Sequence, residues 1–293
     1  MVISGNWNVT MRRALRNLAL KPSDAADTPS VTWKLHREIL LPMGWGRAVL
    51  LQIAHPLVAA GVGEHSSFRN GWAGRLYRTL EAMLKMTFGT PEESASVAQS
   101  INAAHDRVNG RLSEAAGGFP AGTRYSAHDP HLLRWVHGTL VDSCLLLYEL
   151  YVGSLTLEEK DRYCAEASGI EPLLRIPKGY LPRSVAELQS YMDAMFQSGE
   201  IVVTDMARDL ARDIVAPSVP SVVRPMFWGL RLPTIGLLPP SIRKAYGFSW
   251  SALDEAALRS TARLSRTLLP LTPSLLRHWP HARTARRRTE RAS

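Results

Sequence analysis

Residues 74–110 hold the pattern around which the chain is organised. They open with GRLYRTLEAM (residues 74–83), turn at Gly89–Thr90 and close with INAAHDRVNG (residues 101–110). Thr90 and Glu93 have capping-box spacing and Pro91 takes the first helical position, which predicts a helix start. We expect Gly110 to end this helix.

Helical spacing places a histidine on the predicted inner face of this second helix. Residues three and four apart share a face, so one stripe is formed by Val97, Ile101, Ala104, His105 and Val108. His105 is therefore expected to point into the core. A buried imidazole needs a partner, and either a backbone carbonyl or a metal satisfies it. Spacing alone favours the carbonyl.

The rest of the chain also predicts helices. Asp129-Pro130 should open a long helix to Gly153, whose inward stripe is Leu133, Val136, His137, Leu140, Cys144 and Leu147. Further capping boxes are Thr156-x-x-Glu159, Ser184-x-x-Glu187 and Ser251-x-x-Asp254. Since no alternating strand pattern persists, the sequence predicts an all-α fold with a single multi-helix globular domain.

The most apolar run, from Ala48 to Gly63, is interrupted by Gln52, His55 and Pro56. This run is too short and too broken to span a bilayer, and we interpret it as a buried core helix. Pro56 lacks a backbone donor and should kink or break the helix.

Composition suggests three regions. These are a partly disordered N-terminal segment (residues 1–30), a helical domain (31–279) and a disordered, arginine-rich tail (280–293). The net charge is +9, but no basic face interleaved with aromatics indicates nucleic-acid binding. The tail favours solubility or weak contact with an anionic membrane surface. The two cysteines form no CxxC pair and the N-terminus has no signal-peptide pattern, so we expect a cytoplasmic protein.

Four ordered blocks carry a resemblance to a known family. They are LLQIAHPLVAAGVGEHSSFR (50–69), GRLYRTLEAMLKMTFG (74–89), INAAHDRVNG (101–110) and RYSAHDPHLLRWVHGTLVDS (124–143). The chain resembles the DUF2236 family of MpaB-like and latex-clearing rubber oxygenases. The similarity extends from about Trp33 to Tyr246.

The resemblance implies a largely helical protein that binds haem b. It implies that His105 is the proximal iron ligand and that Arg75 and Thr79 support the haem pocket. Arg78 stands where the rubber oxygenases have a distal lysine, and a guanidinium is not expected to ligate iron. The resemblance therefore implies an open distal side.

A haem site also needs an apolar slot, cations for the propionates and an acid–base group. The candidate slot residues are Ile53, Val58, Met83, Met86, Val108, Leu133 and Leu140. The candidate cations are Arg75, Arg78, Arg69 and Arg107. The candidate acid–base groups are Glu64, His65 and His137, with His55 as a fourth.

Other chemistries have weaker sequence support. The Glu-x-x-His pairs of di-iron bundles, the HExxH of zincins and the G-x-S-x-G of hydrolases are all absent from the sequence. His128-x-x-His131 and His278-x-x-His281 have metal-like spacing but adjoin prolines at a loop and in the tail, which argues against physiological sites. GVGEHS (61–66) lacks the glycine spacing of a phosphate loop.

Two functions remain open. The first is a haem-dependent oxygenase or oxidative tailoring enzyme that uses dioxygen on an apolar substrate, such as an isoprenoid or a secondary metabolite. The second is a haem-binding carrier or sensor without turnover. The sequence does not separate them.

Overall fold

The computed structural model describes residues 30–65, 72–216 and 224–291, with the side chains at positions 72–73, 75–76 and 224–228 excepted. The expected N-terminal segment and Arg69 lie outside these ranges, as does the side chain of Arg75. The first half of the fold contains α2 (Val31–His36), η1 (Leu41–Gly44), α3 (Trp45–Ile53), α4 (Pro56–His65), α5 (Trp72–Phe88), α6 (Pro91–His105) and α7 (Pro130–Tyr151).

The second half is also helical. It contains α8 (Leu157–Ala167), η3 (Ser168–Ile170), α9 (Val185–Gln197), α10 (Asp205–Val215), α11 (Arg224–Gly236), α12 (Pro240–Ala245), α13 (Ala252–Leu268), η4 (Leu269–Leu271), α14 (Ser274–Arg277) and α15 (Pro280–Glu290). Between α6 and α7, strands β1 (Asn109–Arg111) and β2 (Arg124–Ser126) form an antiparallel pair. The predicted all-α fold with one globular domain is confirmed.

The predicted helix starts are confirmed by their hydrogen bonds. Thr90 and Glu93 bond each other's backbone N–H groups, and Thr156 with Glu159 and Ser251 with Asp254 do the same. The Ser184 side chain accepts from Glu187 N, but the Glu187 carboxylate accepts from Arg183 N instead of completing the box. The Asp129 side chain accepts from His131 N at 2.9 Å and opens α7.

Helix α6 differs from the prediction at its end and on its inner face. It stops at His105, and Gly110 lies in β1 opposite Tyr125. Its buried side chains are Ser94, Ala98 and Asn102, while His105 is only half-buried and Ala104 is exposed. Asn102 faces the core because its side-chain nitrogen donates to Leu173 O at 2.8 Å. On α7, Leu140 is exposed, contrary to its expected place on the inward stripe.

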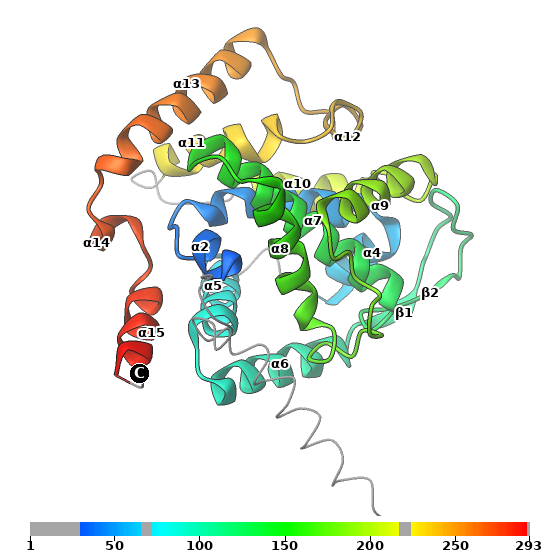
Figure 1. The fold of residues 1–293 in the computed structure, drawn as a ribbon. Coiled ribbons are helices and arrows are strands. Elements are labelled where there is room, and N and C mark those ends of the chain that lie inside the picture. Colours follow the sequence, from blue (N-terminus) through cyan, green and yellow to red (C-terminus); the bar gives the residue numbers. More distant parts are fainter. Residues whose placement is uncertain (1–29, 66–71, 217–223, 292–293) are drawn as a thin grey trace, which may run out of the picture.

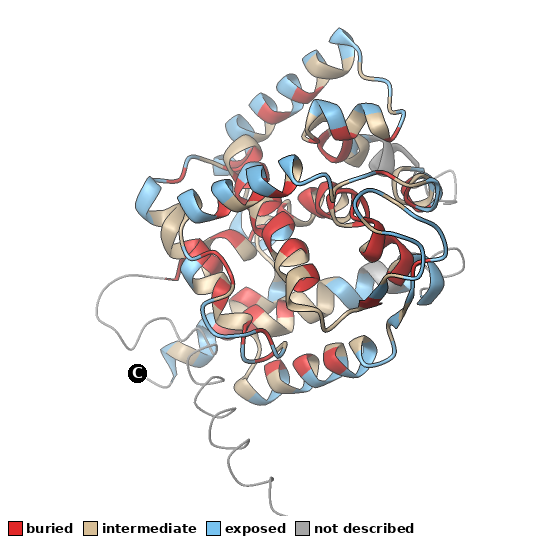
Figure 2. Ribbon diagram, turned by 90° about the vertical axis from the view of Figure 1, so that its right-hand side faces the viewer, coloured by how far each residue is buried: buried red, intermediate tan, exposed pale blue. Residues whose placement is uncertain are grey.

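Helices α3 and α7 form the centre of the molecule, and α6 and α13 lie at opposite ends of it (Figure 1). The approach between α7 and η1, which leads into α3, is close, since a Cβ at Gly44 would come within 3.0 Å of Ser143 O. Trp135 of α7, fully buried, donates from its indole nitrogen to Leu51 O at 3.2 Å. Figure 2 shows the buried residues gathered toward the middle of the molecule and the exposed ones on its outward faces.

The C-terminal segment, expected to be a disordered tail, instead contains helix α15. Ala282 and Ala285 are buried against Leu84 and Phe88 of α5. Helix α14, which precedes α15, is bound to the start of the domain through Arg277, whose Nε donates to the fully buried Glu38 at 2.7 Å. Small residues at helical spacing let this arginine-rich segment pack, although its composition resembles that of a solvated chain.

The buried guanidinium of Arg47 connects three parts of the core. Its Nη1 lies 2.7 Å from Asp142 Oδ2 and donates to Ser143 Oγ at 2.6 Å, and its Nε donates to Leu237 O at 2.7 Å. Arg47 is 5% exposed, so its charge is held away from water. These bonds join α3 to α7 and to the residue that follows α11.

We expect Asp142→Ala to lower the free energy of unfolding by about 3 kcal/mol, because it leaves the Arg47 charge buried without its carboxylate. Urea unfolding at neutral pH measures the effect. Asp193→Ala is the control, since Asp193 is an exposed aspartate on α9, and we expect it to change the same quantity by less than about 0.5 kcal/mol. Equal effects of the two substitutions would contradict the role given to the Arg47–Asp142 pair.

Candidate functional site

A break between α3 and α4 fixes the direction of α4. The segments Leu41–Ile53 and Pro56–His65 meet at 107°. Pro56 begins α4, where no backbone donor is required. Leu57 N donates to His55 Nδ1 at 3.3 Å, so the histidine caps the new helix. The predicted break at Pro56 is confirmed, and it leaves His55 fully buried between the helices.

The far end of α4 meets the β1–β2 pair. Tyr125 of β2 donates its hydroxyl proton to Glu64 Oε2 at 2.5 Å. Burial, and then this bond to Glu64, raises the pKa of Tyr125. His65 Nε2 donates to Asn109 O at 3.1 Å and lies 3.3 Å from the Tyr125 oxygen. Glu64 and His65, both predicted as acid–base groups, therefore lie together around one tyrosine, with their own side chains exposed.

His105 lies four residues before Asn109, at the end of α6. Its buried Nδ1 has no hydrogen-bond partner among the described residues. Burial lowers the pKa of His105, the neighbouring His128 lowers it further, and Asp106 opposes them. The lowered pKa favours the neutral imidazole, which is the form in which a histidine ligates iron. The buried Nδ1 of His137 also has no partner among the described residues, so this feature is not particular to His105.

Several polar side chains lie around His105. The rings of His105 and His128 contact edge to face, with centroids 5.6 Å apart. His128 Nε2 and Arg175 Nη1 both bond Asp106 Oδ1, at 2.7 and 3.0 Å. His128, which follows the hairpin directly, therefore links the end of α6 to the start of α7.

The predicted supporting residues lie on α5, which packs against α6. Arg78 and Thr79 are exposed there, as is Arg107 beyond the end of α6.

The predicted apolar slot does not form as one surface. Val58 packs against both the central core, which includes Ile53, and the Leu57 cluster, which Val108 joins. The other buried or half-buried members belong to separate clusters: Met83 to one with Leu84, Met86 to one with Leu173, and Leu133 to one with Leu181.

His137 is placed differently from the other predicted acid–base groups. Its Nε2 donates to Ala167 O at 3.2 Å, at the end of α8. Burial lowers its pKa to about 4. This neutral histidine joins two helices, and the hydrogen bonds of Glu64 and His65 lead instead to the hairpin.

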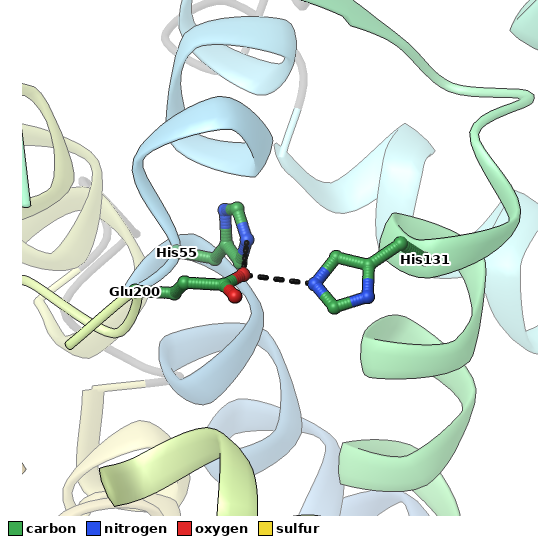
Figure 3. A group of neighbouring side chains, drawn as sticks. All are labelled: His55, His131 and Glu200. Atoms are coloured by element: carbon green, nitrogen blue, oxygen red, sulfur yellow. Dashed lines mark hydrogen bonds and ion pairs between the residues drawn. The ribbon is translucent and has the colours of Figure 1, made fainter. Parts of the chain in front are cut away.

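Sequence reasoning missed a second cluster. His55 Nε2 and His131 Nε2 lie 3.5 and 2.8 Å from the same oxygen of Glu200 (Figure 3). The two histidines were named from the sequence, but Glu200 was not. Glu200 lies between α9 and α10, 69 residues after His131, so no short spacing could have indicated it.

A groove with a volume of about 970 Å³ opens beside α4. One wall is formed by Pro56, Ala60 and Gly63, and the others by residues 112–117 and by α10. The lining includes Leu112 and Met206 but also the charged groups Glu114, Asp205, Arg208, Asp209 and Asp213. The groove therefore combines an apolar floor from α4 with acidic edges.

The fold is all-α, and several of its histidines gather at the ends of α4 and α6 and at the start of α7. Residues 33–267 match the family model described as "ER-bound oxygenase mpaB/B'/Rubber oxygenase, catalytic domain". The chain belongs to this family. No curated protein and no solved structure matches it significantly. Within the described ranges, no single helix is long and apolar enough to cross a membrane.

Burial of histidines predicts the pH dependence of stability. The pKa values of His36 and His137 are lowered by burial from 6.5 to about 4. The unfolded chain therefore binds these protons at a higher pH than the folded protein does. Stability should fall as the pH drops from about 6.5 to 4, by roughly 1.4 kcal/mol per pH unit for each group.

We expect His137→Gln to flatten this slope by about the share of one histidine, roughly 1.4 kcal/mol per pH unit. Urea unfolding of both proteins at pH 4.5, 5.5, 6.5 and 7.5 measures the two slopes. Above pH 7 both curves should be flat with respect to this histidine. A slope that is identical in the two proteins between pH 4.5 and 6.5 would show that His137 is not held neutral by the fold.

Proposed function

We propose that the chain is a haem b-dependent oxygenase that acts on a small apolar substrate. The family is an oxygenase catalytic domain, which supports oxygenase activity and an enzymatic role. The observation that carries the haem proposal is the half-buried His105, whose pKa is lowered and which stands at the position that the family resemblance assigns to the iron ligand. The other partner of the reaction would be dioxygen.

The residues around His105 fit a haem ligand in their chemistry. An axial histidine must be neutral and must offer one nitrogen that no other group occupies. The lowered pKa of His105 meets the first condition. Its Nε2 is the atom proposed to bind the iron, and its Nδ1 has no partner among the described residues. When bound, the haem would supply dioxygen binding and redox chemistry. Arg75 and Thr79 are proposed to support it from α5, and Arg78 would not ligate iron.

Glu64 and His65 are the acid–base groups that the geometry favours. Both lie at the end of α4. Glu64 bonds Tyr125, and His65 bonds Asn109, which is four residues after His105 in the chain. Tyr125 donates its proton to the Glu64 carboxylate, and the His65 imidazole lies beside the tyrosine oxygen. These groups are therefore proposed to serve as the acid–base groups of the reaction. His137, bonded to the end of α8, is proposed to have a structural role.

We expect His105→Ala to lose most of the haem. The measurement is the Soret absorbance per folded protein after expression with haem supply, and added imidazole should restore part of it. His137→Ala is the matched control, because it removes another neutral, half-buried histidine on a neighbouring helix, and it should keep the haem.

Three other outcomes would count against this proposal. A wild-type protein without a Soret band after reconstitution would contradict haem binding altogether. Loss in His137→Ala alone would move the ligand role to α7. If both variants kept the haem, neither histidine would be the ligand.

In the haem-loaded protein, consumption of dioxygen with an apolar substrate separates an oxygenase from a carrier or sensor.

A further inference from the structure

The second histidine cluster joins three segments that are distant in sequence. His55 lies at the break between α3 and α4, His131 in the first turn of α7, and Glu200 in the connection from α9 to α10. Figure 3 shows both imidazole rings directing a nitrogen toward the same oxygen of the Glu200 carboxylate. One ligand atom from each of the three residues lies within 4.8 Å of the other two.

His55 has a buried polar atom whose contact with the Glu200 carboxylate is long. The residue is 0% exposed, and its Nε2 makes no hydrogen bond among the described residues. The Nε2 atom faces Glu200 Oε2 at 3.5 Å, beyond the usual length of a nitrogen–oxygen hydrogen bond. Buried polar atoms are normally paired, so this one points to a group that binds between the two side chains.

The donor set fits a divalent transition metal. Two imidazole nitrogens and one carboxylate oxygen are the ligands of many zinc and non-haem iron sites. We propose that His55, His131 and Glu200 bind one divalent metal ion of the Zn²⁺ type. The side chains of Glu200 and His131 are 29% and 40% exposed, which gives the ion a path from solvent and leaves room for water as a further ligand.

Two features of the surroundings bear on binding. Burial is the main reason why the pKa of His55 is lowered to about 4, so the ring is neutral at pH 7 and needs no deprotonation. Against this, Leu57 N–H donates to His55 Nδ1 at 3.3 Å, which places the ring proton on Nε2 in the metal-free state. Metal binding must move that proton to Nδ1 and break this contact. The loss of one long hydrogen bond is small beside the gain of three metal–ligand bonds.

The site would lie at the wall of the groove beside α4. Pro56, the neighbour of His55, lines the groove, and Gly117 of its rim lies against Gly199, the neighbour of Glu200. The Phe119 ring covers His55, with centroids 5.2 Å apart, and keeps water from that side. This proposal does not depend on haem, because it uses none of the residues to which the proposed function gives a role at the haem site. His55 was a fourth acid–base candidate from the sequence and has no role there.

The test uses tag-free protein that has been treated with EDTA, dialysed and then titrated with Zn²⁺ in a calorimeter. Elemental analysis after desalting counts the zinc separately from any haem iron. The wild-type protein should bind one Zn²⁺ per chain. His131→Gln and Glu200→Gln should each weaken binding at least tenfold, whereas His128→Gln, which changes a nearby histidine outside the cluster, should bind like the wild type.

The variants change partly exposed side chains, and circular dichroism checks that each is folded. Absence of stoichiometric binding in the wild-type protein would overturn the proposal whatever the variants do. Binding that survives in both His131→Gln and Glu200→Gln would do the same. His105→Ala should retain the zinc, and if it lost zinc while His131→Gln kept it, the metal would belong to the other histidine group.

Discussion

The break at residues 54–56 is the constraint on which the rest of the arrangement depends. Pro56 has no backbone donor, so a continuous helix through it would lose a hydrogen bond and force the ring against the preceding turn. The chain instead ends α3 at Ile53 and starts α4 in a new direction, at 107°. Helix α3 thereby stays in the core with α7, and α4 carries Glu64 and His65 to the hairpin. The same break buries His55, whose Nδ1 caps the new helix.

The predicted features that the structure confirms are mainly local ones. A capping box involves residues three apart, so Thr90 and Glu93 define the start of α6 whatever packs against it. Proline at a first helical position acts in the same way at Pro91 and Pro130. The end of α6 depends on a distant segment, because the residues from Asn109 onward form strand β1 and pair with β2. A glycine at position 110 therefore marks a strand here and not a helix stop.

The inner face of α6 shows why hydrophobic spacing alone does not predict which residues of a helix are buried. The buried stripe contains Ser94 and Asn102, two polar residues that bond the carbonyls of Lys85 and Leu173. A polar side chain can be buried when a distant segment supplies its partner, and that partner is invisible in the local sequence. Glu200 was missed for the same reason, since its contacts with His55 and His131 come from separate parts of the chain. The proposed apolar slot failed because residues of one chemical type were distributed among several helix contacts.

The start of α7 connects the two histidine groups. His128 precedes the cap and contacts His105, whereas His131, held by the Asp129 cap, contacts Glu200. Because Asp129 fixes the rotation of the first turn, the two histidines are directed to different neighbours by one local interaction. The positive end of the helix dipole also lies here and favours the nearby carboxylate of Glu200. A single helix start, already visible in the sequence as Asp129-Pro130, thus positions residues of both proposed sites, although their partners become evident only in the folded chain.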